Sequence, residues 1–463
     1  MDAPGERDGA SSAPGRRDVT CPIMGRVEID WPLLPAKIWC FFSAASQACY
    51  YAFLPVVYAN MGLNAAQIGV LTGFSPLIGS LSMPAWTALA DAWHAHREIL
   101  CATALVSTIL HCFLPACPPK LSILLPLVLV TEGTFSPAVP LADAAIGLTL
   151  CRAKRPFADY GKQRLWGAVS WGFVFAPGIG FIEDFTTGRL RLAAPYVGHV
   201  LCTVFAVAAA VRLKQPGDED VGAGGEEDTV ELLDGAPNGA CHDSEPRAGD
   251  TRMGVLQVAA RLWRSLRATP GALVHCALFL VAGAAGGVMD TFLFVMLRNM
   301  GGGGALMGLA LTCTCISEVG VFARAGDIQT ALGGYRQCFS LVLACFWIRL
   351  LLYAGLPLLR SPWAVMPVQL LHGVTFGLFW QISNGYMRAL APSQDLVSTY
   401  QGLFQALNSL GSFFGQLLGG IVTQRLGCPR MFLCASIVMS VAHAAYWAAT
   451  RDEAMFANAA AVT

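Results

Sequence analysis

Ionisable side chains interrupt the apolar stretches of this sequence at only a few positions. Placing a charge within a lipid bilayer costs about 2.5–3.5 kcal/mol or more, so such a residue predicts a functional site by default. An ion pair that only holds helices together is the alternative for each charge taken singly. Acids and bases occur in both halves of the chain, however, which favours function for the set. Its members are Glu132, Asp143, Arg164, Asp290, Glu318 and Arg349, with His111, His199, His275 and His372.

Arg164 and Trp171 form the most suggestive pair. They are seven residues apart, which is nearly two turns and predicts one shared helix face. A guanidinium can bind hydroxyls or carboxylates as a fork, and an indole offers a flat apolar surface. The pair therefore favours binding of a polar organic solute with one apolar side.

The elements that carry these residues are predicted to be membrane helices. The chain is 55% apolar and 13% charged, with a mean hydropathy of +0.54, whereas soluble domains are about 25% charged. This composition excludes an ordinary soluble enzyme and a disordered chain, and the absence of a basic excess excludes a nucleic-acid binder. A span needs about 20 mostly apolar residues. Such runs occur near 34–59, 65–90, 98–116, 121–150, 162–182, 192–213, 270–297, 304–325, 336–358, 362–391, 396–424 and 429–450.

The pattern of runs is six, a polar break and six more. Eleven acids and one base lie between residues 215 and 250, so no packed core can form there and a solvated linker is expected. The sequence thus predicts an all-α membrane protein of 12 transmembrane helices in two six-helix pseudo-symmetric halves, an architecture of transporters built from parallel repeats. The expected parts are a disordered tail (1–30), the N-terminal half (31–213), an acidic linker (214–262), the C-terminal half (263–451) and a second tail (452–463).

Lysine and arginine in the loops predict the orientation. If both termini are cytoplasmic, the inner loops and tails hold 22 of the 30 positive residues and the outer loops hold seven. Positive residues accumulate on the cytoplasmic side of membrane proteins. We therefore expect cytoplasmic termini, a cytoplasmic linker and a multi-pass protein, in the plasma membrane rather than an internal one.

Two segments resemble the major facilitator superfamily. Residues 160–173, YGKQRLWGAVSWGF, are similar to the Tyr/Phe-Gly-x-x-Arg-x-x-Gly-x-x-x-Trp motif of its sugar–proton symporter-like branch, with Gly161, Arg164, Gly167 and Trp171 in the matching positions. The segment SMPAWTALADAWHAHR resembles the loop after helix 2, and places Asp91 and Arg97 in a cytoplasmic charge latch from which two further family residues are missing. The likeness is closest to the orphan domain-containing protein 6 and 6-like group.

The resemblance implies roles for the charged residues of the first half. In the sugar branch, the matching Arg and Trp bind the substrate together with a carboxylate from helix 4. The aligned position here is Pro140, and Asp143 follows three residues later, so the substrate is expected to differ from that sugar. Glu132 is a further substrate-binding candidate without a family counterpart.

In the second half, the resemblance implies a coupling network. Arg349 and His372 match an Arg and a His of the symporters, and Asp290 approximately matches a helix 7 acid. The proton-carrying glutamate of the family is replaced by Thr375, and a nearby basic residue by Gln369. Threonine cannot titrate, so Glu318 is the candidate to carry a proton instead. Proton coupling and facilitated diffusion both stay open.

The sequence therefore predicts a secondary transporter that moves a small polar organic solute by alternating access. A receptor or sensor on a transporter fold is the main alternative, and a channel or membrane enzyme is a third. No enzyme motif with its required context is present, and no metal or cofactor is expected. The expected partners are the solute, protons and the lipid bilayer, with the protein a monomer and no nucleic acid bound.

Overall fold

The computed structural model describes residues 16–21, 25–153, 155, 160–186, 188–214, 255–269, 271–391 and 397–451. The predicted acidic linker lies almost wholly outside these residues, and so does the predicted tail 452–463. Ten of the described helices are long and apolar enough to span a membrane, and a pair bent by 42° forms an eleventh span. α17 (Val397–Leu426) completes the expected 12-helix architecture. It is less apolar because it carries Gln401, Gln405, Asn408, Gln416 and Gln424.

The N-terminal half contains six passes, several of which are broken at proline. The first consists of α1 (Leu34–Tyr50), a 3-10 turn η2 (Tyr51–Phe53) and α2 (Leu54–Asn60). The fourth breaks between α5 (Leu121–Phe135) and α6 (Ala138–Arg152), because Pro137 lacks the N–H that would continue the helix. The remaining elements are α3 (Ala65–Trp93), α4 (His96–Phe113), α7 (Tyr160–Val169), the π-helix η5 (Ser170–Phe175), α8 (Ala176–Phe185) and α9 (Gly188–Ala210).

The C-terminal half repeats this arrangement after the amphipathic helix α10 (Val255–Ala268). Its tenth pass is the bent one, and a π-helix, η9 (Gly373–Leu378), lies inside it. Its other elements are α11 (Ala272–Asn299), α12 (Gly304–Phe322), the short α13 (Ala325–Leu332), α14 (Tyr335–Gly355), α15 (Val365–Gln369), α16 (Phe379–Leu390) and α18 (Cys428–Ala449).

The N-terminal segment differs from the expected disordered tail over residues 16–30. There β1 (Arg16–Cys21) and β2 (Gly25–Asp30) pair as an antiparallel hairpin, with Val19 opposite Val27. The β-branched residues of these short segments favour extended backbone, a local signal that the polar composition of residues 1–30 as a whole conceals.

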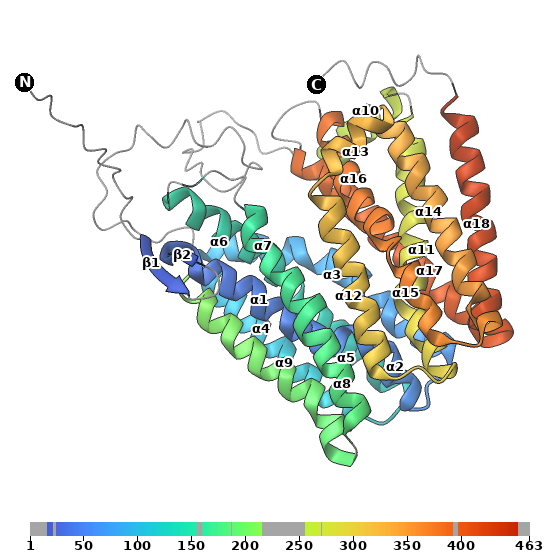
Figure 1. The fold of residues 1–463 in the computed structure, drawn as a ribbon. Coiled ribbons are helices and arrows are strands. Elements are labelled where there is room, and N and C mark those ends of the chain that lie inside the picture. The colour runs from blue at the N-terminus through green and yellow to red at the C-terminus, as the bar shows by residue number, and fades with distance from the viewer. Residues whose placement is uncertain are drawn as a thin grey trace, which may run out of the picture.

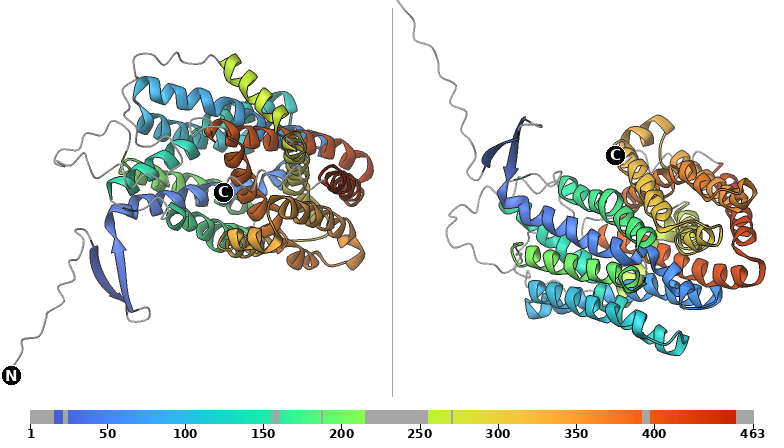
Figure 2. Two further views of the ribbon diagram at one scale, coloured as in Figure 1. Left: turned by 90° about the horizontal axis from the view of Figure 1, so that it is seen from above. Right: turned by 60° about the horizontal axis from the view of Figure 1, so that its bottom comes forward.

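The two halves meet at one end of the molecule and draw apart toward the other. Near the meeting end, α3 packs on α17 and α8 packs on α12. Small residues permit the approach: a Cβ added to Gly180 would overlap the backbone of Gly304, and one added to Gly308 would overlap that of Ala176. At the other end, α6 and α7 diverge from α13 and α16 (Figure 1), and the N-terminal and C-terminal helices form two bundles in the further views (Figure 2).

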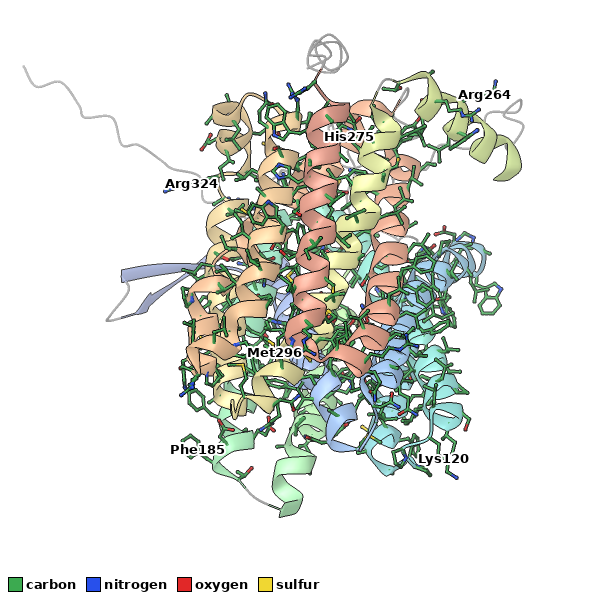
Figure 3. The ribbon with its side chains drawn as sticks, turned by 90° about the vertical axis from the view of Figure 1, so that its right-hand side faces the viewer. Lys120, Phe185, Arg264, His275, Met296 and Arg324 are labelled. Atoms are coloured by element: carbon green, nitrogen blue, oxygen red, sulfur yellow. The ribbon has the colours of Figure 1, made fainter. Side chains whose placement is uncertain are left out.

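The loops alternate between the two ends as the predicted topology requires. Lys120 and Phe185 lie at the end where the halves meet, and Arg264 and Arg324 lie at the opposite end (Figure 3). The start of α1, helix α10 and the end of α18 all belong to the open end. The two halves therefore diverge toward the end at which the described chain begins and ends.

Candidate functional site

A buried arginine organises the polar residues of the C-terminal half. Arg349 of α14 is 5% exposed. Its Nε donates to the Tyr353 hydroxyl at 2.7 Å, Nη1 donates to Thr375 Oγ1 at 2.8 Å, and Nη2 donates to Gln369 Oε1 at 2.8 Å. The Tyr353 hydroxyl also donates to Gln369 Oε1 at 2.5 Å. Neutral partners thus surround the guanidinium, in place of the glutamate and the basic residue that the symporter pattern has at positions 375 and 369.

His372 connects this arginine to Glu318. His372 Nδ1 lies 3.2 Å from Arg349 Nη1, and its Nε2 lies 3.9 Å from Glu318 Oε2. The bend in the tenth pass makes this possible, because Gly373 packs directly on α12 and its N–H donates to Ser317 Oγ at 3.0 Å. Three of the four residues expected to form a coupling network, Glu318, Arg349 and His372, are therefore neighbours.

Asp290, the fourth expected member, lies apart from this chain of contacts. It is exposed although it lies within the membrane-spanning helix α11, and it is close enough to Arg349 and to Tyr51 for an electrostatic interaction. Exposure in the middle of a span indicates that the carboxylate faces the space between the halves.

In the N-terminal half, the structure pairs Arg164 with Asp143. Arg164 Nη1 donates to Asp143 Oδ2 and to the Tyr160 hydroxyl, both at 2.9 Å. The arginine side chain is 57% exposed and the aspartate 35%, so both could still contact a ligand. Arg164 also lies within electrostatic range of Glu318 in the other half. Asp143 thus lies beside the arginine, three residues after the aligned position Pro140.

Trp171 lies where the fifth pass changes from α-helix to π-helix. It is half-buried. The wider turn begins at Ser170, so the α-helical spacing used to relate Trp171 to Arg164 ends there. The π-helix brings Gly172 against α12: its carbonyl accepts a hydrogen bond from Thr312 Oγ1 at 2.6 Å, and a Cβ at Gly172 would lie 2.5 Å from Cys315 Cβ. A straight α-helix would not be expected to produce this contact.

Glu132 belongs to a different cluster from the other predicted substrate-binding residues. It is 9% exposed and its Oε1 lies 3.7 Å from His111 Nε2, which in turn lies 2.7 Å from the Tyr50 hydroxyl. His199 lies beside both aromatic rings, 4.4 Å from Tyr50 and 5.2 Å from His111 between ring centroids. The sequence marked His111 and His199 as ionisable residues within apolar runs, but their spacing along the chain did not indicate that they lie near Glu132.

The expected cytoplasmic latch residues contact other groups. Asp91 Oδ1 lies 2.8 Å from His96 Nε2, and Arg97 Nη2 donates to the Leu213 carbonyl at 3.2 Å. His96 lies at the start of α4, and its side chain is only 11% exposed. Over the described residues, no group of three or more His, Cys, Asp or Glu residues could hold a metal ion.

Comparison with known proteins gives the family. The family model described as the MFS_1 like family matches residues 33–434. A maltose permease of Geobacillus stearothermophilus is 26% identical over 377 residues, which is 81% of this chain and 83% of the permease. A major facilitator superfamily domain-containing protein 6-like of Danio rerio is 28% identical over 174 residues, but this covers only 37% of this chain and 31% of the relative.

Solved structures show the same fold. The nucleoside transporter NupG, in one mutant form, superposes with a TM-score of 0.71 at 13% identity, over 90% of this chain and 99% of that one. A bacterial homologue of the human lysosomal transporter Spinster, inward-facing and unoccupied, gives a TM-score of 0.60 at 12% identity, over 93% and 98% of the two chains. These relatives and neighbours are transporters rather than enzymes. The chain is a multi-pass membrane protein that belongs to the MFS_1 like family of the major facilitator superfamily.

Proposed function

We propose that this protein is a secondary transporter that moves a small polar organic solute by alternating access. The observation that carries the proposal is the placement of charged residues from both halves in one region. Arg164 and Asp143 come from the N-terminal half, and Glu318 and His372 from the C-terminal half. The halves pack closely toward one end of the molecule and diverge toward the other. Rocking of the halves around this region would open it to the other side.

The solute class follows from the groups available to bind it. Arg164 can donate through its exposed guanidinium, and Asp143 and Glu318 can accept from hydroxyl or amino groups. Aromatic rings adjoin them on the C-terminal side: His372 stacks on Phe376 at 5.2 Å, and Phe376 on Trp380 at 5.8 Å. A flat solute rich in hydroxyl groups, such as a sugar or a nucleoside, fits this combination. The relatives named for maltose and nucleosides support the same class.

The proposal also covers the coupling of transport to protons and the orientation of the protein in the membrane. Glu318 and His372 are neighbouring titratable groups on the C-terminal side of the solute site, so uptake that responds to a proton gradient is expected to depend on them. The 22-to-7 distribution of positive residues favours cytoplasmic termini, which makes the open side cytoplasmic and the described state inward-facing. We place the protein, as a monomer, in the plasma membrane.

A receptor or sensor is the second candidate. The observation in its favour is Thr375. This residue occupies the position of the proton-carrying glutamate in the symporter pattern, and its neutral hydroxyl accepts a hydrogen bond from Arg349. A receptor would bind the same solute without moving it across the membrane.

Uptake into proteoliposomes tests the proposal. A panel of radiolabelled sugars, maltose included, and nucleosides is offered to the wild-type protein, to Arg164→Ala and to Arg324→Ala. Arg324 is an exposed arginine at the open end of the molecule (Figure 3) and is not one of the proposed solute-binding residues, so it controls for loss of a positive charge. We expect Arg164→Ala to reduce uptake of one solute class by tenfold or more, in line with about 1.5–3 kcal/mol for a lost charge-assisted hydrogen bond. If no solute shows uptake that depends on Arg164, the proposal fails.

A further inference from the structure

We propose that Glu132 and His111 form a proton-binding site inside the N-terminal half, separate from the solute site. This inference rests on the proposed function only in assigning the bound proton a role in transport. His111 of α4 contacts both Tyr50 of α1 and Glu132 of α5 in the interior of the six-helix bundle, and His199 of α9 lies against Tyr50 and His111. Among these four residues the largest exposed fraction is 9%.

The carboxylate has no permanent cation beside it. In the described part of the chain, the ion-pair partner of Glu132 is His111, and no Lys or Arg side chain lies within ion-pair distance of it. α3, which packs along α5, carries one ionisable residue, Asp91, at its far end, where it pairs with His96. The titratable groups that face Glu132 from the other packed elements are tyrosines and histidines: Tyr50, Tyr51, Tyr58, His111, Tyr196 and His199.

The net charge of the cluster therefore depends on one proton. With Glu132 ionised and His111 neutral, the cluster holds one uncompensated negative charge in the protein interior, which is strongly unfavourable. A proton taken from water forms either the O–H bond of a neutral Glu132 or the second N–H bond of an imidazolium at His111. In either case the buried charge is cancelled, and releasing the proton restores it.

The hydrogen bonds of the histidines leave room for this proton. His199 Nδ1 must carry hydrogen, because it lies 3.0 Å from the Ser46 carbonyl oxygen, which only accepts. His199 Nε2 is therefore a bare acceptor when the ring is neutral. Neither His199 Nε2 nor His111 Nδ1 has a hydrogen-bond partner among the described residues, and the two side chains are 2% and 4% exposed. Unpaired ring nitrogens at these depths are costly in a purely structural network.

The neighbouring residues also position the cluster. Ser46 Oγ lies 2.7 Å from His199 Nδ1 and 2.8 Å from Thr203 Oγ1, which lies 3.0 Å from Thr108 Oγ1. These hydroxyls hold α1, α4 and α9 together behind the two imidazole rings. Tyr51, the residue after Tyr50, is exposed and within electrostatic range of both Glu132 and Asp290. It is thus near both the buried cluster and the carboxylate of Asp290.

Infrared titration of the purified full chain in lipid nanodiscs, without solute, tests the inference. As the pH is raised, either the carboxylic-acid band or the imidazolium band of the wild type should lose the intensity of one group, and Glu132→Gln should lack this loss. Glu98→Gln, which removes an exposed carboxylate at the start of α4, should leave the titration unchanged. An identical titration of the wild type and Glu132→Gln would overturn the proposal.

Two further variants keep the test decisive if Glu132→Gln does not fold. Tyr50→Phe and His111→Gln retain the size of the side chains, and each should shift the midpoint of this loss by about one pH unit, as expected for loss of a contact worth about 1.4 kcal/mol. If neither Tyr50→Phe nor His111→Gln shifted the midpoint, Tyr50 and His111 would not belong to the proton-binding site. A midpoint that changed with sodium concentration would show that the site binds sodium instead of a proton. The infrared titration measures no transport, so failure to observe the expected loss would refute the proton-binding site alone. If that loss is observed but the proteoliposomes show no uptake, only the proposed function is refuted.

Discussion

The carboxylate of Glu183 and the guanidinium of Arg298 form an ion pair across the two halves of the molecule, at the end where the halves meet. Glu183 lies at the end of α8 and Arg298 at the end of α11. Both side chains are more than two-thirds buried, so the pair is shielded from water better than a surface salt bridge. Alternating access requires this contact to break whenever the molecule opens toward that side.

Removing this ion pair should favour opening at the closed end. Glu183→Gln is expected to weaken the closed arrangement by about 1–3 kcal/mol, the range for a charge-assisted hydrogen bond. Hydrogen exchange of the last turn of α8 and the first turn of α12 should then accelerate by roughly tenfold or more. Glu98→Gln serves as the control, because Glu98 is exposed on the first turn of α4. Equal exchange at this end in the wild type and Glu183→Gln would show that the pair does not hold the halves together.

Asp184, the next residue, caps α12 from the opposite half. Its two carboxylate oxygens accept from the N–H groups of Gly304 at 2.7 Å and Ala305 at 2.9 Å. Asp184→Ala should cost about 0.5–2 kcal/mol, as other helix caps do, and lower the midpoint of thermal unfolding. Asp184→Asn retains one acceptor oxygen and should recover part of the loss. If the alanine and asparagine variants unfold at the same temperature as the wild type, the cap contributes nothing.

The glycines of α17 permit its contact with α11. A Cβ at Gly411 would overlap the Leu280 carbonyl oxygen, whereas one at Gly402, on the same helix, would meet no atom within 4 Å. Gly411→Ala should therefore destabilise the protein by about 1–3 kcal/mol through overpacking, and Gly402→Ala should be neutral or stabilising by up to about 1 kcal/mol. Thermal unfolding of the two variants in one detergent gives the comparison. A Gly411→Ala protein as stable as Gly402→Ala would contradict the packing described.

Arg349 should not be replaceable by lysine. Its three nitrogens donate to three different side chains, a fork that an ammonium group cannot reproduce. Arg349→Lys leaves buried acceptors without partners, each at about 1–3 kcal/mol, and should lower thermal stability clearly. Arg324→Lys, at an exposed position, is the matched control. Should both variants melt together, the network around Arg349 would have no structural role.

The fold was largely predictable because membrane helices are encoded locally. Apolar runs located the spans, and Pro137 marked the break in the fourth pass. The residues near positions 170 and 373 were harder, because a π-helix depends on how tightly Gly172 and Gly373 pack against α12, and that contact is made by residues distant in sequence. The hairpin at 16–30 was missed because its strands are short and embedded in a polar, glycine-rich segment.

The candidate site was only partly predictable. Family motifs singled out Arg164, Arg349 and His372, whereas the contact between Asp143 and Arg164 became clear only from the structure. The position of Glu132 could not be derived from these motifs. Its partners come from α1, α4 and α9, and the interruption of helix 4 between α5 and α6 separates it from Asp143. Periodicity along one helix cannot specify which neighbouring helices its polar residues face.

Solute counterflow tests the central claim most directly. Proteoliposomes are preloaded with a high concentration of the unlabelled solute identified in the uptake panel and diluted into a trace of the labelled form. An alternating-access carrier should transiently accumulate label above the external concentration, because the excess unlabelled solute inside competes for the returning site, and Arg164→Ala should abolish this accumulation. Simple equilibration of label would indicate a channel, and binding without entry a receptor. Either result would contradict a carrier whose halves alternate around Arg164 and Glu318.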